Sequence, residues 1–587
     1  MTSLKQLLTT SFADAFEARG LDRKFGEVVV SQRPELGQFQ CNGALAAARI
    51  QKKNPSGIAQ SVINALEHRE AFAEVSLAEP GFINILLADE FLAAHVQQIA
   101  RDERLGCSPV AEPQHILIDF GGPNVAKPMH VGHLRSTLIG DSLQRLCRFM
   151  GNQVTSDIHL GDWGTPLGML IVELKRRQPD LPYFDAAYTG PYPEEPPVAI
   201  SDLQEMYPSI AARCQQDPSE MEAALKATVE LQQGRAGYRA LWRHFVDVSM
   251  KELKEDFESL GVTFDLWLGE SDYHDQIPQM IEKLQLSGHA QMSEGALIIP
   301  LSQTNSQKEI PPLMLVKSDG GFLYGTTDLA TLIQRVEDFR ADQILYVVDA
   351  RQSLHFQQLF RAAYQTGLAQ AVKLEHIAFG TVNGPDGKPF KTRAGGAMRL
   401  KDLMAMVTAE ALKRIAETGM AEGYADSERL DVARKVGLAA LKFADLMNHR
   451  TSDYVFDLEK FAKFEGRTGP YLLYTTVRIK SILRSAQDKS LIPGAILPPT
   501  PPERDLMLTL CELPDAVQNA YLNYAPNYLC DFAYTLAREF NRFYDQCHIL
   551  SEANPARQSS WLALSQLCLA ELELLLSLLG IETPDRM

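Results

Sequence analysis

The chain has 587 residues, of which 45% are hydrophobic and 22% are charged, and 57 Lys+Arg against 74 Asp+Glu give a formal net charge of −17. This length predicts about three or four domains, and the composition excludes wholesale disorder. The acidic balance argues against a protein that coats nucleic acid nonspecifically, but it leaves room for local basic grooves.

The cysteines and the chain ends bear on the cellular compartment. None of the eight cysteines has C-x-x-C spacing, so we expect buried free thiols in a reducing environment. The N-terminus lacks a basic region followed by an apolar core, so no signal peptide is predicted. The most apolar stretch, 562–579, contains Glu571 and Glu573 and looks too short and too charged to span a membrane. We therefore expect a cytoplasmic protein without membrane association.

The first elements along the chain suggest a small α/β domain over residues 1–108. After it, a strand over 115–120 runs through a Gly/Pro loop into a helix over 131–150, and a second strand follows at 154–160. Strand, helix and strand in about 45 residues predict a βαβ unit with parallel strands. The predicted elements of the first domain are helices over 4–18 and 58–68 and strands over 27–31, 74–77 and 82–87.

In the rest of the chain, the predicted helices and strands alternate less regularly. A Pro- and Gly-rich loop, 183–198, leads into an inserted helical stretch over 219–260, and short strands are expected at 344–348 and 376–382. Beyond about residue 397 the pattern is helical, apart from a proline-rich linker or loop at 491–504. The predicted fold class is multidomain α/β: an N-terminal α/β domain (1–108), a doubly wound core (109–396) with a helical insertion at about 175–260, and an all-helical domain (397–587).

The most informative segment, 119–133, reads DFGGPNVAKPMHVGH. It leaves the carboxyl end of a strand, where ligands of open α/β sheets bind, and enters a helix whose first N–H groups can hold a phosphate. His130 and His133 add donors, and Gly132 leaves room for a flat ring, so these parts suit ATP. For the two histidines alone, a structural role or zinc binding is the alternative. Zinc is disfavoured because no cysteine or H-E-x-x-H arrangement lies nearby.

The segment 124–137, NVAKPMHVGHLRST, resembles the signature of class I aminoacyl-tRNA synthetases in the form used by arginyl-tRNA synthetases, with 130–133 as its version of the "HIGH" sequence. The similarity spans nearly the whole chain. Further matching segments, in the family's order, are 161–164, 269–271, 319–328, 349–352, 387–395, 466–471 and the terminal 581–587.

This resemblance implies a Rossmann-like nucleotide-binding core, an N-terminal domain that binds the tRNA elbow and a helical anticodon-binding domain. It implies a ligase that makes arginyl-adenylate from L-arginine and ATP and moves arginine to the 3′ end of its tRNA, with tRNA bound before activation. Mg²⁺ is expected with ATP, no protein ligand is assigned to it, and no other metal site is predicted. We expect a monomer.

By the resemblance, Asp328 takes the substrate guanidinium and Tyr324 lines the same pocket. A planar, permanently charged guanidinium requires carboxylate and planar acceptors, which fits this pair. The spacing of four residues puts both on one face of a helix that begins here. Taken alone, Asp328 could instead be a helix cap, and Tyr324 could fill a turn.

Four other residues complete the arginine pocket implied by the resemblance. Asp119 and Asn124 match the positions that hold the α-amino and carboxylate ends of the substrate. Gln352 resembles a further substrate contact, and Glu270 adds negative charge. For Asp119, which ends a strand, anchoring a loop is the alternative.

The family usually carries a mobile lysine-bearing loop, "KMSKS". The matching stretch here, 389–393, has Pro389 and Thr392 in place of the usual first and second lysines. Cations of this loop and Lys127 are expected to stabilise the pyrophosphate leaving group, while a solvated basic hairpin is the alternative. No general base is expected, because in-line attack needs positioning and neutralised charge. The predicted catalytic residues are His130, His133, Lys127, Lys388 and Lys391, and the predicted ATP contacts are His130, Gly132 and His133.

Aromatic residues with an arginine suit RNA bases that are splayed out and stacked. By the resemblance, one such group lies in the helical domain, and helix-packing tyrosines with a solvated arginine are the alternative. A weaker match lies in the N-terminal domain, where a core position is the alternative for Phe82. The predicted tRNA contacts are Tyr471, Tyr474, Arg478, Tyr544, Phe82 and Asn84.

Two rival interpretations stay open from the sequence. One is another class I nucleotidyl-transferring enzyme with a different substrate, against which Tyr324, Asp328 and Gln352 argue. The other is a catalytically silent paralogue that only binds tRNA. The intact loop 124–133 argues against a silent paralogue, whereas Pro389 and Thr392 in the lysine loop keep that alternative open.

Overall fold

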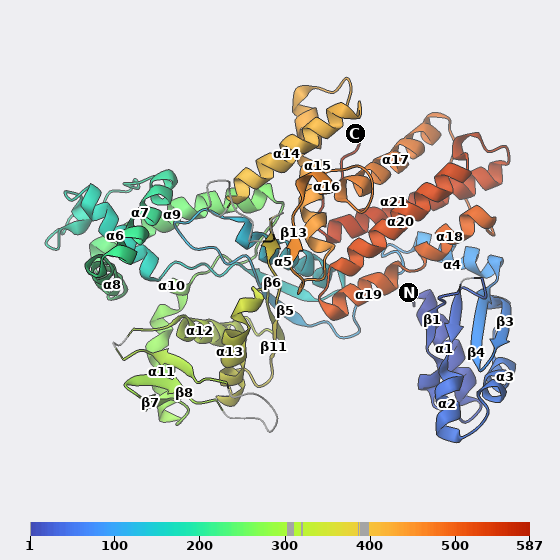
Figure 1. The fold of residues 1–587 in the computed structure, drawn as a ribbon, viewed down its shortest axis with the longest axis horizontal. Helices are drawn as coiled ribbons and strands as arrows, with labels where there is room; N and C mark the ends of the chain where they lie inside the picture. Colours follow the sequence, from blue (N-terminus) through green and yellow to red (C-terminus); the bar gives the residue numbers. More distant parts are fainter. Residues whose placement is uncertain (1, 34, 302–309, 319–320, 385–386, 388–397) are drawn as a thin grey trace. The chain divides into compact units, whose positions relative to one another are not determined.

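The computed structural model describes residues 2–33, 35–301, 310–318, 321–384, 387 and 398–587 (Figure 1). The predicted residues Lys388, Pro389, Lys391 and Thr392 lie outside these ranges. The chain forms two compact units. Unit 1 comprises 1–110, 411–443 and 461–587, and unit 2 comprises 111–410 and 444–460.

Unit 2 is built on a four-stranded sheet in the order β11-β10-β5-β6, in which every neighbouring pair is parallel. The predicted βαβ unit is confirmed: β5 and β6 pair in parallel and α5 connects them. Ile116, Leu117 and Ile118 of β5 are fully buried, as expected for a central parallel strand covered on both faces. The elements are β5 (His115–Asp119), α5 (Val131–Phe149), β6 (Gln153–Asp157), β10 (Gln343–Tyr346) and β11 (Lys373–His376).

One face of this sheet shares a buried apolar cluster with α11, α12, α13 and a small antiparallel sheet, β7-β8-β9. Leu117 of β5, Ile344 of β10, Leu329 of α12 and Leu359 of α13 all belong to it. The antiparallel sheet was not predicted. These elements are α10 (Glu270–Tyr273), α11 (Ile277–Leu286), β7 (Gln291–Ser293), β8 (Ala296–Ile299), β9 (Leu313–Val316), α12 (Tyr324–Glu337) and α13 (Ser353–Gln365).

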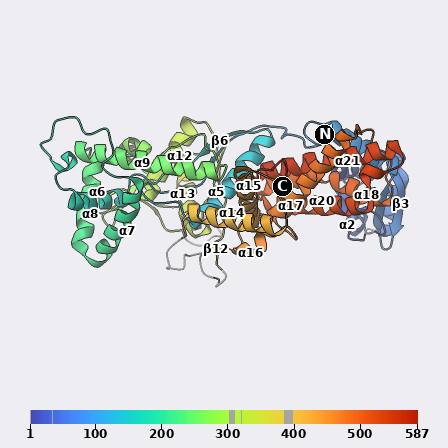
Figure 2. The same cartoon turned by 90° about the horizontal axis from the view of Figure 1, so that it is seen from above.

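The insertion consists of four helices, which lie together in both views (Figures 1 and 2). The stretch predicted over 219–260 is interrupted near Gly234, which adopts a left-handed conformation with φ of 90°. A buried apolar core that includes Leu170, Leu203, Leu231 and Phe245 joins the four helices. They are α6 (Thr165–Arg177), α7 (Ile200–Gln216), α8 (Pro218–Gln232) and α9 (Ala236–Ser259).

The prediction of a single strand over 376–382 is wrong. Its first part belongs to β11, which pairs with β10, whereas β12 pairs in parallel with β13 in a separate two-stranded sheet. The remaining elements of this region are β12 (Val382–Asn383), β13 (Tyr454–Val455), α14 (Leu400–Glu417), α15 (Asp426–Leu446) and α16 (Leu458–Phe461).

Unit 1 begins with a four-stranded antiparallel sheet in the order β1-β2-β4-β3. The predicted second helix starts earlier than expected, because Asn54 caps it by accepting from the N–H of Ser56 at 3.0 Å and Pro55 opens its first turn. The elements are α1 (Leu4–Glu17), β1 (Val28–Val30), β2 (Phe39–Cys41), α2 (Gly43–Gln51), α3 (Pro55–Ala65), β3 (Phe72–Ala78), β4 (Phe82–Leu87) and α4 (Asp89–Arg101).

The rest of unit 1 is helical, and α17, α20 and α21 run beside one another in Figures 1 and 2. The proline-rich stretch ends sooner than predicted, since Pro501 and Pro502 form the first turn of α18, where a missing N–H costs nothing. All eight cysteines are buried and free, which confirms the prediction. The helices are α17 (Gly469–Asp488), α18 (Pro501–Leu510), α19 (Leu513–Asn523), α20 (Asn527–Gln546) and α21 (Pro555–Leu578).

Helix α21 contains nearly all of the most apolar stretch, 562–579, and it corrects the prediction that this stretch is too short to span a membrane. It has 24 residues, and an 18-residue window with a mean hydropathy of 1.5 makes it long and apolar enough to cross a membrane. The judgement that the stretch is too short is therefore wrong. However, 67% of that window is buried inside the protein, as in the central helix of a bundle.

Gly140 of α5 is required next to Phe120, the residue that follows β5, because a Cβ at this position would overlap the buried ring of Phe120. We expect Gly140→Ala to destabilise unit 2 by about 1–3 kcal/mol through overpacking, measured as a lowered thermal unfolding midpoint. Gly57→Ala is the matched control, since Gly57 lies in α3 with open space around it. An unchanged midpoint for Gly140→Ala would contradict this account of the packing.

Candidate active site

A buried ion triad lies at the carboxyl edge of the parallel sheet. Asp119 ends β5 and Asp157 ends β6, and because the strands are parallel both carboxylates emerge at the same edge. Arg335 of α12 lies between them, with Nη2 at 2.8 Å from Asp119 Oδ2 and 2.7 Å from Asp157 Oδ2. Sequence reasoning missed Arg335, whose spacing within an amphipathic helix resembles that of any exposed arginine.

Arg335 is charged despite its burial. Arg335 is 1% exposed, and burial alone would lower the pKa of its guanidinium. The attraction of Asp119, Tyr346 and Asp157 outweighs that effect and holds the pKa of Arg335 well above its ordinary value. The Arg335 guanidinium also lies 5.3 Å from the ring centre of Tyr346, at the end of β10.

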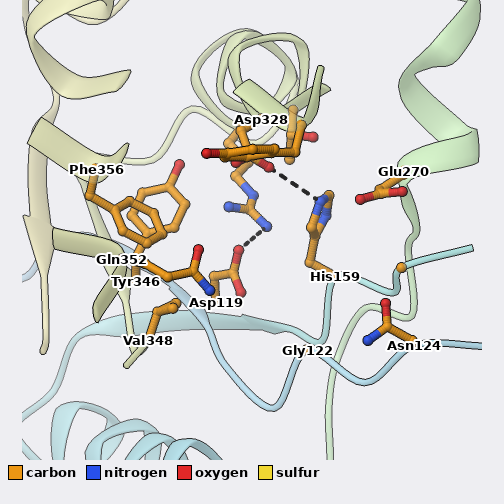
Figure 3. A pocket seen from close by; sticks show the side chains of 14 residues that line it. Asp119, Gly122, Asn124, His159, Glu270, Asp328, Tyr346, Val348, Gln352 and Phe356 are labelled. Atoms are coloured by element: carbon orange, nitrogen blue, oxygen red, sulfur yellow. Dashed lines mark ion pairs between the residues drawn. The ribbon is translucent and has the colours of Figure 1, made fainter. Parts of the chain in front are cut away.

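A cavity of about 310 Å³ opens beside the triad (Figure 3). Residues from β5, the loop after it, α10, α12 and the start of α13 line it. His159 and Arg335 also line it, although the sequence did not indicate either. All six residues predicted for the arginine pocket are brought together here: Asp119, Asn124, Glu270, Tyr324, Asp328 and Gln352.

Helix α12 carries Tyr324 and Asp328 on its first two turns, as the spacing predicted. Leu323 is the N-cap of this helix and Asp328 is its fifth residue, so the alternative that Asp328 caps the helix is wrong. Asp328 Oδ2 instead lies 2.6 Å from Nε2 of His355. The ring of Tyr324, which is 61% exposed, lies 4.7 Å from the ring of His355.

His159 and Glu270 both line the cavity. His159 follows β6 with a φ of 43°, a left-handed conformation that is uncommon outside glycine, and its Nε2 lies 3.9 Å from Asp328 Oδ1 (Figure 3). Neither ring nitrogen has a hydrogen-bond partner among the described residues. Burial, together with the nearby carboxylates of Asp328 and Asp162, raises the pKa of Glu270 to about 7, and His159 opposes this shift.

Asn124 is held where the loop after β5 meets the loop after β6. Asn124 and Gly161 form an isolated parallel bridge, and Val125 N donates to Gly161 O at 3.0 Å. A Cβ on Gly161 would overlap Oδ1 of Asn124, so glycine here leaves the Asn124 side chain in its place. The G-D-W-G segment thus contributes to the site through its backbone.

The two histidines of the predicted phosphate loop cap α5. His130 is the N-cap, and its Nδ1 accepts from the N–H of Gly132 at 3.0 Å. Nδ1 of His133 accepts from the N–H of His130 at 3.2 Å. Burial, together with the adjacent His130, lowers the pKa of His133 to about 3, and burial also lowers the pKa of His130. Both rings are neutral at pH 7.

This capping determines the tautomers. Because each Nδ1 accepts a backbone N–H, each neutral ring must carry its proton on Nε2, which makes Nε2 a donor. The structural role is therefore compatible with the predicted donor role. Within the described residues, no cluster of three or more His, Cys, Asp or Glu side chains could hold a metal, so nothing favours the zinc alternative.

The segment 127–131 makes contacts with α7 and with the chain around residue 399. Lys127 Nζ lies 4.4 Å from the ring centre of Tyr207 in α7. Val131 N donates to Met398 O at 3.0 Å, and Leu400 N donates to Met129 O at 2.9 Å. The chain immediately after the predicted second loop therefore pairs with the segment around His130.

The residues of the helical domain that are predicted to contact RNA are joined by hydrogen bonds through the side chain of Asn541. Arg478 donates to Asn541 Oδ1 at 2.6 Å and to the hydroxyl of Tyr474 at 2.9 Å, and its guanidinium lies 5.5 Å from the ring centre of Tyr544. Asn541 Nδ2 donates to the hydroxyl of Tyr471 at 2.9 Å. Arg478 is thus not simply solvated, and the four predicted residues form one surface of α17 and α20.

The N-terminal pair lies side by side on β4. Phe82 is half-buried at the start of the strand. Asn84 is 4% exposed, and its Oδ1 accepts from Gln40 at 2.8 Å across the sheet. A direct contact of either side chain with RNA stays a prediction.

Comparison with known proteins decides the family. The model for the catalytic domain of class I (R) tRNA synthetases matches residues 95–458, that for the arginyl-tRNA synthetase N-terminal domain matches 2–87, and that for the DALR anticodon-binding domain matches 472–587. The arginine–tRNA ligases of Maricaulis maris and Alkaliphilus oremlandii are 51% and 48% identical, over 100% of both chains in each case. The chain belongs to the arginyl-tRNA synthetase family.

A solved arginyl-tRNA synthetase from Plasmodium falciparum is 25% identical and superposes with a TM-score of 0.83, covering 100% of both chains. The predicted fold class, a Rossmann-like core with a small N-terminal domain and a helical C-terminal domain, is confirmed. The prediction of a class I synthetase, and thus of a ligase, is confirmed as well. The roles assigned to single residues stay predictions.

We expect Arg335→Met to destabilise unit 2 by about 3–5 kcal/mol at pH 7.5, because Asp119 and Asp157 would lose their buried counter-ion. At pH 5 the deficit should shrink, since protonation removes the unpaired charges. The measurement is chemical unfolding at both pH values. Arg351→Met, which removes an exposed arginine paired with Asp349, is the control and should cost about 1 kcal/mol or less. An equal deficit at both pH values would contradict the charge argument.

Proposed function

We propose that this protein is an arginine–tRNA ligase. The carboxylate of L-arginine attacks the α-phosphorus of ATP and pyrophosphate leaves, which forms arginyl-adenylate; a hydroxyl of the terminal tRNA ribose then attacks the arginyl carbonyl and AMP leaves. The observation that carries the proposal is the cavity lined by the carboxylates of Asp328 and Glu270, neither of which forms an ion pair with an arginine among the described residues. Relatives named arginine–tRNA ligase that match over the full length support it and do not support a silent paralogue.

The acidic cavity suits a guanidinium. Asp328 and Glu270 offer acceptors from two different helices, and Tyr324 offers an aromatic face on which a planar cation can stack. Asp119, Asn124 and Gln352 lie at the strand-edge side of the same cavity and are proposed to hold the α-amino and carboxylate ends. One oxygen of Asp119 is already engaged by Arg335, so Oδ1 is the atom left for an ammonium.

The ATP end rests on the start of α5. Nε2–H of His130 and of His133, with the positive end of the helix dipole, can stabilise charge on the triphosphate as the bond to pyrophosphate breaks. Gly132 keeps a Cβ away from the His130 ring, which it would otherwise crowd. Lys127, Lys388 and Lys391 are proposed to neutralise the leaving group. Mg²⁺ would bind chiefly through phosphate oxygens, with no protein ligand assigned.

The partners are L-arginine, ATP and the tRNA for arginine. Tyr471, Tyr474, Arg478 and Tyr544 are proposed to stack on anticodon bases, and Phe82 and Asn84 to meet the tRNA elbow, with domain limits near residues 108 and 396. We further propose a cytoplasmic monomer that needs bound tRNA for activation.

ATP–pyrophosphate exchange tests this function. We expect exchange with arginine and with no other common amino acid, and we expect it only when tRNA is present. Incorporation of labelled arginine into tRNA should follow at the same enzyme concentrations. Exchange driven by a different amino acid, or none under any condition, would overturn the proposal.

The raised pKa of Glu270 makes arginine binding pH-dependent. The substrate guanidinium stays charged throughout, so its own titration does not contribute to the pH dependence. Below that pH Glu270 is protonated and neutral, and we expect the KM for arginine to rise by up to about tenfold per pH unit. Steady-state exchange between pH 5.5 and 8.5 measures this.

Glu270→Gln should raise the KM at pH 8 and abolish that acid limb. Glu282→Gln, which changes an exposed glutamate of α11, should leave the profile as in the unaltered protein. A persistent acid limb in Glu270→Gln would assign the titration to another group.

A further inference from the structure

His355 lies behind the carboxylate that is proposed to take the guanidinium. It belongs to α13, is 7% exposed, and places Nε2 2.6 Å from Oδ2 of Asp328. The other carboxylate oxygen, Oδ1, is the one that lies toward His159 across the cavity (Figure 3). The two oxygens of Asp328 therefore have different surroundings.

The imidazole of His355 is held in place by neighbouring aromatic rings. Its ring lies 4.7 Å from the ring of Tyr324 and 5.2 Å from that of Phe356. Phe356 in turn stacks on His376 of β11 at 4.6 Å. Since aromatic contacts flank His355, its Nε2–H has a set direction, and that direction is toward Asp328.

We propose that His355 is a positioning residue that sets the plane of the Asp328 carboxylate and so determines selectivity for a planar cation. This inference rests on the proposed function. By occupying one lone pair of Oδ2, His355 prevents the carboxylate from rotating about its χ2 torsion, which is otherwise broad. The remaining lone pairs then face the cavity in one plane.

A fixed plane matters more to a guanidinium than to an ammonium. A guanidinium forms two parallel N–H···O bonds only when the carboxylate is coplanar with it, whereas an ammonium is a compact point charge that binds a carboxylate in many orientations. Loss of the His355 bond should therefore weaken arginine binding more than lysine binding. No direct contact between His355 and substrate is required.

Three replacements separate the N–H of His355 from its bulk. Glutamine places an amide N–H near the position of Nε2, asparagine places it near Nδ1, and leucine fills the space without a donor. His355→Leu and His355→Asn should raise the KM for arginine about 10–100-fold in tRNA-dependent exchange. The KM for ATP should stay unchanged, and the preference for arginine over lysine should fall at least tenfold.

His355→Gln should restore most of the arginine KM and of the preference over lysine. The matched control is His376→Leu, which removes a half-buried histidine from the same Phe356 stack; His376 Nε2 bonds to Val348 O at 2.9 Å and does not touch Asp328. It should leave the arginine KM unchanged. If His355→Leu does not fold, the comparison of His355→Asn with His355→Gln carries the test.

The outcomes are distinct. Equal arginine KM values for His355→Gln and His355→Asn, or unchanged selectivity in both, would overturn the positioning role. Absence of arginine-dependent exchange in the unaltered protein would instead overturn the proposed function. A His376→Leu variant that also raised the arginine KM would show that packing, not the N–H, is responsible, and would likewise reject the inference.

Discussion

The candidate site depends on one buried ion triad, Asp119–Arg335–Asp157. Two carboxylates from adjacent parallel strands would repel each other away from water, and Arg335 makes their proximity tolerable. The same contact ties α12 to the edge of the sheet. Since Tyr324 and Asp328 lie on the first turns of that helix, the triad also sets where they stand relative to Asp119.

The triad leaves a surplus of negative charge at the sheet edge. Arg335 neutralises one carboxylate, and the carboxylates of Asp328 and Glu270 line the same cavity. A permanently cationic side chain of matching shape would supply the missing charge. The net charge of −17 therefore has a local counterpart at this edge, even though the chain's partners include polyanions.

The start of α5 shows that residues which cap a helix can keep side-chain donors for a ligand. The Nδ1 atoms of His130 and His133 satisfy backbone N–H groups that the helix would otherwise leave unpaired, which frees both Nε2–H groups for a ligand. The structural and functional interpretations of the H-x-G-H sequence are thus not alternatives. The N-terminal position of the helix makes both possible.

Periodicity predicted β5, α5, β6 and α12, because apolar spacing reflects which face a segment buries. It missed the short β2 and β7, and it merged β11 with β12, since a two-residue strand carries no pattern of its own. The six pocket residues could be chosen from motifs, but Arg335, His159 and His355 could not. Their importance arises from contacts with residues far away in the sequence.

The sequence by itself determined the family, the parallel core and the chemical nature of the pocket, because these follow from local motifs and from hydrophobic spacing along each element. Only the tertiary structure decided the buried ion pairs of Arg335, the tautomers of His130 and His133 and the partner of Asp328. Each of these depends on burial and on atoms brought together from separate elements. Such distances do not exist until the chain folds.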